Sequence, residues 1–426
     1  MGIAKSLWIE EQERGWSSIE DAFVCEECVF DYALKELVRD NVQSPECTYC
    51  GRTSTGDPIA ADMNCLMEVV YAGICTEWGD PNSEGVIYES AEGGWQGEVI
   101  DSWTLLSMHL PFCGFVDGPV LEDLATSMAD RQWCQRNFYR LLPQEELAFD
   151  WGRFRELVKY QSRFFFLKEP GLPDEERAPH EILDVLGHFI RDFDLVRTLG
   201  PGTVLFRARR HGKNEHPTTI ADLGPPPRRK AFAANRMSPA GITMFYGAFE
   251  AATARAEVCS DVTDSRPKVT VAPFALTKAM QVVDLSAAPS VPSLFDPKRA
   301  DERVPAVFLR EFMKDFTAPV EKDGCEHIDY VPTQIVTEYL RRVFRDRHNS
   351  EIQGVVYPSS VADGNSCVLF LEEVPTDGLA YLRPNSAEKW LNLDSAHLQT
   401  TRAIRPRSQV QSKRTGGTKL RPRRVR

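Results

Sequence analysis

Apolar residues recur at helical spacing through most of the first 165 residues. They return every three or four positions, which places them on one face of an α-helix. The stretches with this spacing are residues 30–38, 59–74, 120–128 and 154–164. A Gly-rich connector at residues 90–103 interrupts the pattern, while Trp133 and residues 141–147 continue it. The pattern predicts a small α-helical bundle in the N-terminal part of the chain.

Strands mixed with helices are predicted after residue 180. An amphipathic helix over residues 182–196 precedes a short apolar strand, Val204–Phe206. A second buried strand is expected around Tyr246, with an Ala-rich helix over residues 249–258 behind it. The strands expected downstream cover residues 268–274, 280–285, 354–361 and 367–370, and the helices cover 308–316 and 336–344. The C-terminal part is therefore expected to be an α+β domain.

Two domains are also expected from the length of the chain. Its 426 residues exceed what one typical hydrophobic core holds. Residues 168–180 are rich in Pro and charged side chains, which is typical of a linker between domains. We therefore predict an N-terminal domain over residues 1–175, a second domain over 176–375 and a C-terminal extension over 376–426.

Charge is distributed unevenly along the chain. The formal net charge is −12, although residues 402–426 hold ten Lys and Arg and no Asp or Glu. The acidic remainder disfavours nonspecific binding of nucleic acid, which depends on neutralising phosphates. The basic tail is either disordered and solvated, or a contact for nucleic acid, an acidic partner or the body of the protein itself.

The remaining composition indicates a cytoplasmic protein with no membrane partner. No apolar run approaches the ~20 residues needed to span a bilayer, and the first residues do not have the pattern of a signal peptide. Seven of the eleven cysteines are scattered, which fits reduced, buried thiols. The sequence leaves the oligomeric state open, a homo-oligomer included.

The other four cysteines form two C-x2-C pairs, Cys25/Cys28 and Cys47/Cys50, with the spacing of a zinc site. Four thiolates can close a tetrahedral site and leave no position for a substrate, so the pattern predicts a structural Zn²⁺ clip over residues 25–50. Four free buried thiols, or a redox-active pair, are the alternatives.

The two C-x2-C pairs carry most of a resemblance to the HEPN/RES N-terminal domain, a helical domain fused to RES domains, and the C-T-Y-C-G element at Cys47–Gly51 is its most specific part. HEPN ribonucleases cleave RNA with an Arg-x4-His pair, and residues 1–175 contain no such motif. The resemblance therefore implies a scaffold or a sensor.

Four residues of the second part share a pattern with one family. Arg207 follows the first strand in F-R-A, Arg236 lies in N-R-M-S-P-A-G, Tyr246 comes ten residues later, and Glu257 eleven after that. The pattern resembles the RES domain, named for its Arg, Glu and Ser residues. The resemblance implies a fold like that of ADP-ribosyltransferases and an enzyme that degrades NAD⁺, acting as a toxin or an anti-phage effector.

The chemistry of these residue types agrees with that implication. Arginine offers a planar fork of donors that suits a pyrophosphate, and an aromatic ring can stack on a flat nicotinamide. A carboxylate can stabilise the positive charge that develops at the anomeric carbon of a ribose. By resemblance, Arg236, Tyr246 and Glu257 are catalytic and Arg207 binds the substrate.

The serine for which the RES family is named is expected in the Y-P-S-S element. Ser359 is the first candidate, and Ser360 is the alternative. Ser359 is then a catalytic residue, while Ser360 and Asn365 are expected to bind the substrate. Tyr330–Gln334, Y-V-P-T-Q, also resembles an element of this subgroup and is expected at the start of a helix, packed beside the site. Asn235 and Met237-Ser238 depart from the family pattern, which weakens the expected contacts at the edge of the loop.

Other interpretations remain open. An ADP-ribosyltransferase would use the same residues, whereas a non-enzymatic zinc-containing adaptor would need none of them. Each residue also has an ordinary structural explanation: an arginine can be a salt-bridge partner, Tyr246 a core residue and Glu257 a solvated neighbour of Arg255. RES toxins usually pair with an Xre-like antitoxin, so the resemblance implies such a partner, or control by the N-terminal domain in its place.

Overall fold

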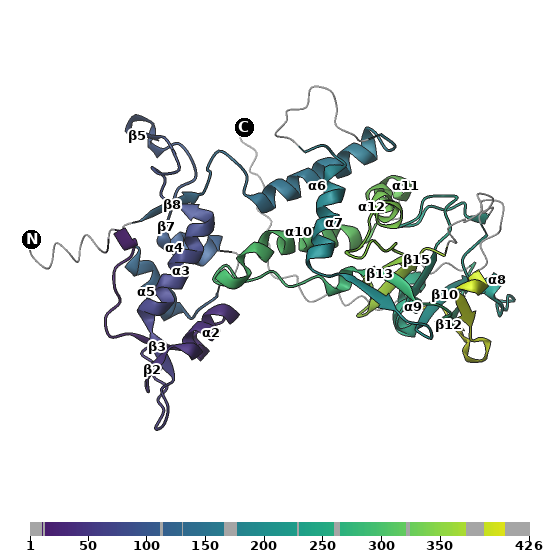
Figure 1. The fold of residues 1–426 in the computed structure, drawn as a ribbon, viewed down its shortest axis with the longest axis horizontal. Helices are drawn as coiled ribbons and strands as arrows, with labels where there is room; N and C mark the ends of the chain where they lie inside the picture. Colours follow the sequence, from purple (N-terminus) through teal and green to yellow (C-terminus); the bar gives the residue numbers. More distant parts are fainter. Residues whose placement is uncertain are drawn as a thin grey trace, which may run out of the picture. The chain divides into compact units, whose positions relative to one another are not determined.

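The computed structural model describes residues 11, 13–110, 114–129, 131–165, 177–227, 230–259, 265–320, 324–371 and 387–404. Most of the predicted linker and nearly all of the predicted basic tail lie outside these residues. The chain divides into two compact units (Figure 1). Unit 1 comprises Met1–Trp151 and Pro289–Glu311, and unit 2 comprises Gly152–Ala288 and Phe312–Arg426. A segment from the second half of the sequence therefore belongs to the first unit.

Unit 1 combines helices with short antiparallel strands. Its main helices are α2 (Tyr32–Asp40), α3 (Met63–Glu77), α5 (Gly118–Ser127) and the first half of α6 (Pro143–Tyr160). One three-stranded sheet has the order β1-β3-β2, with bounds Phe23–Cys25, Ala60–Asp62 and Val42–Ser44. A second sheet contains β4 (Trp78–Gly79), β8 (Gln132–Gln135) and β7 (Ile100–Asp101). The predicted helices are thus present, but a helical bundle alone does not describe this unit, and Trp133 lies in a strand.

Residues 289–311 complete the core of unit 1. Leu294 and Phe295 are buried in the same apolar cluster as α2, α3 and α5, and the rings of Phe115 and Phe295 lie 5.1 Å apart. The Tyr32 hydroxyl donates to Asp296 at 2.8 Å, and Arg303 forms a largely buried ion pair with Glu77 at 3.2 Å. Both apolar packing and polar pairing therefore fix this segment in the unit.

Unit 2 contains a mixed sheet in the order β16-β12-β10-β11-β15-β14-β13-β9, with β17 paired to β12. The pairs are antiparallel except β13–β14, which is parallel. The strands are β9 (Val196–Leu199), β10 (Val204–His211), β11 (Phe245–Ala248), β12 (Lys268–Leu276), β13 (Met280–Asp284), β14 (Gly354–Pro358), β15 (Asn365–Leu369), β16 (Leu391–Leu393) and β17 (Gln399–Arg402). The helices are α7 (Glu181–Asp192), α8 (Ile220–Leu223), α9 (Ala251–Cys259), the end of α10 (Ala300–Thr317), α11 (Glu326–Asp329) and α12 (Val331–Arg342). The predicted α+β character is confirmed.

The two faces of this sheet have different roles. One face buries large side chains, among them Leu205, Phe245 and Phe274. On the other face, small residues of β10 and β11 pack against the Ala-rich helix α9, which lies beside β10 and β12 in Figure 1. Small side chains let a helix approach a sheet closely. The last turn of α9, which carries Glu257, is thereby held against the centre of the sheet.

One local prediction differs from the structure and one agrees closely. The helix expected over residues 182–196 ends at Asp192, because Val196 joins the sheet in β9. Pro332 lies in the first turn of α12, as expected from its missing N–H group. The part of the chain that the structure describes contains no helix long and apolar enough to cross a membrane.

Gly354 tests how tightly β14 is packed between β13 and β15. A Cβ atom at this residue would lie 2.7 Å from the carbonyl oxygen of Val368, which is backbone and cannot move aside. We expect Gly354→Ala to lower the free energy of unfolding by about 1–3 kcal/mol, measured by urea unfolding. Gly200→Ala is the control, since its Cβ meets nothing within 4 Å. Equal stability of the two variants would contradict this packing.

Candidate active site

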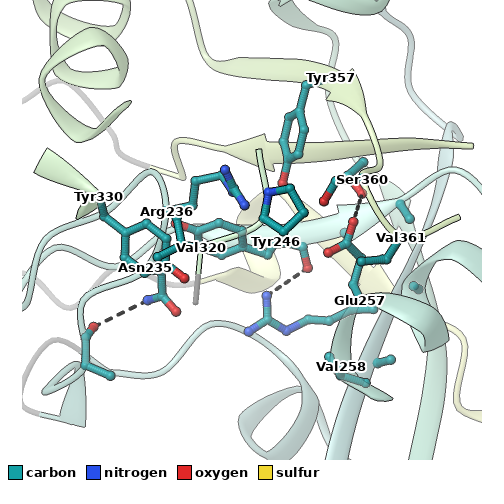
Figure 2. Close-up of a pocket in the computed structure, with 18 of the residues that line it drawn as sticks. Asn235, Arg236, Tyr246, Glu257, Val258, Val320, Tyr330, Tyr357, Ser360 and Val361 are labelled. Carbon is teal, nitrogen blue, oxygen red and sulfur yellow. Dashed lines mark hydrogen bonds between the residues drawn. The ribbon is translucent and has the colours of Figure 1, made fainter. Parts of the chain in front are cut away.

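A cavity of about 870 Å³ opens in unit 2, where α9 meets the centre of the sheet (Figure 2). Its walls come from β10, β11, the β14–β15 hairpin, the α11 region and the turn around residue 236. Four of the residues predicted from the sequence as catalytic or substrate-binding line it together with Ser360: Arg207, Arg236, Tyr246 and Glu257. Segments up to 160 residues apart in sequence, Phe206 to Ser366, therefore meet in one cavity.

Arg207 reaches the cavity between two strands. Strands β10 and β11 share only the pair Phe206↔Ala248, and Arg207 is the next residue of β10. The Arg207 guanidinium donates to the carbonyl oxygen of Tyr246 at 2.9 Å and lies 5.3 Å from the centre of the Phe245 ring. Its buried Nε has no hydrogen-bond partner. A carbonyl satisfies a donor but does not neutralise a charge.

The environment of Arg207 leaves its positive charge uncompensated. No carboxylate pairs with it among the residues that the structure describes. Burial, together with the neighbouring Arg209, lowers the pKa of Arg207 to about 10, so it stays charged at neutral pH. A buried cation without a counter-ion is costly. The chemistry of Arg207 would therefore suit an anionic ligand.

Arg236 lies on a tight turn. The backbone of Asn235 and Ser238 pairs in both directions, at 2.8 and 3.2 Å. The Tyr246 hydroxyl accepts from the N–H of Met237 at 3.3 Å and lies 2.9 Å from the Ser238 hydroxyl. Ser238, a departure from the family pattern, is buried and ties the turn to Tyr246.

The first turn of α12 also holds the Arg236 turn. Thr333 donates its hydroxyl to the carbonyl oxygen of Arg236, and Gln334 donates its amide to that of Asn235 at 2.8 Å. Both side chains are buried, and Arg236 itself donates to the carbonyl oxygen of Phe316 at 3.0 Å. The structure thus gives the Y-V-P-T-Q element a positioning contact with Arg236, beside the packing expected from the sequence.

Aromatic rings form much of the remaining wall. Tyr330 lies under the Arg236 guanidinium, 5.9 Å from ring centre to charge, and Tyr357 lines the cavity from β14. Burial raises the pKa of Tyr246 to about 12 and that of Tyr357 well above its ordinary value. Both tyrosines therefore stay neutral at physiological pH and can donate hydrogen bonds.

Glu257 lies on another side of the cavity from Arg236, with Tyr246 between them in Figure 2. Its Oε1 accepts a hydrogen bond from Ser359 at 2.6 Å and one from Ser366 at 3.1 Å. Ser360 lines the cavity but makes no such bond. Asn365 donates to Ser286 at 3.0 Å and is not among the lining residues. Of the two rival serines, Ser359 is the one in contact with the glutamate.

Comparison with known families agrees with this arrangement. The RES domain model matches residues 204–394, which include every residue of the cavity wall, and the model of HEPN/RES N-terminal domain 1 matches residues 40–171. This chain is a RES-domain protein with a HEPN/RES N-terminal domain. The N-terminal match includes Cys47 and Cys50 but begins after Cys25 and Cys28.

Other comparisons add little to the RES assignment. No curated protein matches the chain. Among solved structures, it is similar to the M. tuberculosis MbcT–MbcA toxin–antitoxin complex, with 16% sequence identity and a TM-score of 0.26. That match covers 51% of this chain and 92% of the other.

The RES cavity also contains residues that the sequence did not single out. Ser366 and His327 line it without belonging to a sequence motif described above, and Tyr357 belongs to the Y-P-S-S element, in which only the serines were given a role. Ser366 follows Asn365 at the start of β15, before the apolar residues of the strand, and this position gives no signal of its own. Tyr357 and His327 also have no signal, because a tyrosine in a strand and a histidine in a short helix such as α11 are ordinary.

The four cysteines predicted as metal ligands lie together in unit 1. Their sulfur atoms all fall within 4.8 Å of one another, with separations of 3.5 Å for Cys25–Cys50 and 3.9 Å for Cys28–Cys47. Although burial opposes it, hydrogen bonds from the backbone of Cys50, Cys25 and Tyr49 lower the pKa of Cys47 to about 7. Gly51, with φ of 66°, closes the turn behind Cys50. Such a cluster could hold a metal ion.

Replacing Arg207 with Met tests whether this cation serves a ligand or the fold. We expect the free energy of unfolding to stay unchanged or rise by up to about 2 kcal/mol, because an uncompensated buried charge is removed. Inorganic pyrophosphate should raise the melting temperature of the wild-type protein by a few degrees and leave that of the variant unchanged. Arg209→Met, an exposed position on the same strand, is the control for general loss of charge. A clear loss of stability in Arg207→Met would instead assign this arginine to the fold.

Proposed function

We propose that this RES-domain protein cleaves the bond between nicotinamide and ribose in NAD⁺. The observation that carries the proposal is a single cavity lined by two arginines, Arg207 and Arg236, and by two glutamates, Glu257 and Glu326. Among the residues that the structure describes, neither arginine forms an ion pair with a carboxylate. NAD⁺ has the complementary chemistry, a pyrophosphate at its centre and a positively charged ring on a ribose. The resemblance to the RES family implies the same reaction.

The anionic part of the substrate would bind at the arginines. Arg207 and Arg236 supply forked donors for the pyrophosphate, and a bound phosphate gives the buried Arg207 the counter-charge that it lacks. Tyr330 or Tyr246 offers a ring face for the nicotinamide. Binding energy from these contacts would hold the ribose against Glu257.

Glu257 would act where charge develops. As the bond between C1′ and the nicotinamide nitrogen breaks, the electron pair leaves with nicotinamide and C1′ becomes oxocarbenium-like. A carboxylate beside C1′ stabilises that charge more than it stabilises the substrate. Water then bonds to C1′ and loses a proton, so NAD⁺ and water give ADP-ribose, nicotinamide and H⁺. With inorganic phosphate as the nucleophile, the products are nicotinamide and phosphorylated ADP-ribose.

The biological role follows from the chemistry. Depletion of NAD⁺ would stop growth, so we propose that the protein acts in the cytoplasm as a growth-arresting toxin or an anti-phage effector. Its activity would be controlled by an antitoxin that covers the cavity, or by the HEPN/RES N-terminal domain.

Release of nicotinamide from NAD⁺ by the purified protein tests the proposed reaction. We expect Glu257→Gln to lower kcat by about 10²-fold or more, because the isosteric amide cannot stabilise the cationic transition state. Glu250→Gln, an exposed glutamate just before the same helix, should keep wild-type activity. Chromatography of the products, with and without phosphate, distinguishes hydrolysis from phosphorolysis.

Two results of this assay would change the assignment. Label from NAD⁺ that appears on a macromolecule in place of free ADP-ribose would identify an ADP-ribosyltransferase. No release of nicotinamide by a folded protein, with or without phosphate and with its antitoxin absent, would contradict the proposal and favour the adaptor.

We also propose that the four cysteines hold a structural Zn²⁺. Tetrahedral coordination with Zn–S bonds of about 2.3 Å places sulfur atoms about 3.8 Å apart, close to the separations found here. Four thiolates fill the coordination sphere, so the ion would stabilise unit 1 and leave no place for a substrate.

Elemental analysis tests the metal. We expect one zinc per chain in the wild-type protein and almost none in Cys28→Ala, together with a large loss of stability of unit 1, because three thiolates are left without their ion. Cys65→Ala, which changes a thiol outside the cluster, should keep its zinc. A wild-type protein that is fully folded after removal of all metal by a chelator would refute a structural ion.

A further inference from the structure

Ser366 is an unusual residue for its place in the fold. It lies in β15, opposite Ala248 of β11 and Tyr357 of β14, in the middle of the sheet of unit 2. Its exposed fraction is 2%, and the three residues after it in the strand are fully buried and apolar. An apolar side chain would be expected here, because a buried hydroxyl is costly without a hydrogen bond.

The hydroxyl of Ser366 has a partner of a particular kind. Within the described residues it donates to Oε1 of Glu257 at 3.1 Å, across 109 positions of sequence. Hydrogen bonds to a charged acceptor are stronger than those to a neutral one. The contact therefore explains why a serine can occupy this position.

A second serine reaches the same oxygen from the other strand of the hairpin. Ser359, just after β14, donates to Oε1 at 2.6 Å, while its own oxygen accepts from the N–H of Val361 at 3.2 Å. The two hydroxyls thus come from both arms of the β14–β15 hairpin. Glu257 itself is exposed, near the end of α9, and a glutamate side chain has several rotatable bonds to restrain.

We propose that Ser366 is a positioning residue for Glu257, which together with Ser359 holds the carboxylate in its reactive orientation. The part of this inference that concerns catalysis rests on the proposed cleavage of NAD⁺. An exposed glutamate held at one oxygen by two fixed hydroxyls loses little entropy when it meets the developing charge. The β14–β15 hairpin therefore supplies two hydroxyls to the same carboxylate oxygen, one from each of its arms.

The positioning role of Ser366 predicts which kinetic constant changes when the residue is replaced. Ser366 acts through Glu257 and not on the phosphates or the nicotinamide ring, so its loss should affect the transition state and not the binding of substrate. We expect Ser366→Ala to lower kcat about tenfold, with KM for NAD⁺ within about twofold of the wild-type value. Ser366→Thr keeps a hydroxyl at the same place and should restore most of kcat.

A matched control separates this effect from a general loss of stability. Thr270 is another fully buried hydroxyl in the sheet, in β12, where it bonds to His211 and Thr400 away from the cavity. Thr270→Val should change the melting temperature without changing kcat. An equal fall of kcat in Thr270→Val and Ser366→Ala, or an unchanged kcat in Ser366→Ala, would overturn the positioning role.

Thermal unfolding tests the contact itself without any substrate. In the Glu257→Ala background the Ser366 hydroxyl is buried without its partner, so Ser366→Ala should raise the melting temperature there. In the wild-type background it should lower the melting temperature or leave it unchanged. The two changes should differ by about 2–4 °C, the amount expected for a single hydrogen bond in a domain of this size.

The kinetic experiment and the thermal unfolding experiment test different parts of the inference, so one part can be refuted without the other. If the wild-type protein released no nicotinamide, the proposed reaction would be refuted. The difference in melting temperature would still show that Ser366 forms a hydrogen bond with Glu257. If Ser366→Ala changed the melting temperature equally in both backgrounds, the positioning contact between Ser366 and Glu257 would be refuted, even in a protein that cleaves NAD⁺.

Discussion

The register between β11 and β15 is the constraint on which the cavity depends. It sets Tyr246 opposite Val368 and Ala248 opposite Ser366, and the next pair along sets Ser366 opposite Tyr357. Residues directly opposite one another in antiparallel strands share a face, so these side chains all point to the cavity side of the sheet. A slip by one residue would turn Ser366 into the apolar core and bring Cys367 to the cavity. The large buried side chains on the other face make such a slip unfavourable.

Two arginines of the cavity have hydrogen-bond acceptors but no paired carboxylate among the described residues. Arg207 and Arg236 donate to backbone carbonyls, which satisfies hydrogen-bond donors and leaves the positive charge in place. Elsewhere in unit 2, cations such as Lys159 pair with carboxylates in the usual way. The sheet and its apolar core supply the stability that offsets the cost of a buried charge without a counter-ion.

Local features of the chain were predictable from the sequence, and distant contacts were not. The strands and the Ala-rich helix expected between Val204 and Val258 correspond to β10, β11 and α9, although the short helix α8 was missed. The family resemblance selected Arg236, Tyr246 and Glu257, which line one cavity. Ser366 could not be assigned, because its role depends on the register of a strand pair that the sequence does not specify. The short strands of unit 1 were missed for a related reason. Two- and three-residue strands such as β4 and β1 have no measurable periodicity and are held by their partners.

The placement of residues 289–311 in unit 1 bears on how the protein is made. During synthesis the N-terminal residues leave the ribosome first and domains usually fold in that order. Here the core around α2, α3 and α5 lacks Leu294 and Phe295 until most of the sheet of unit 2 has been translated. The cysteine-bearing unit therefore cannot complete this core until nearly half of the RES domain has been synthesised. Nascent chains cut short before residue 289 would carry an incomplete N-terminal core, and they would be poor candidates for a stable, independently folded fragment.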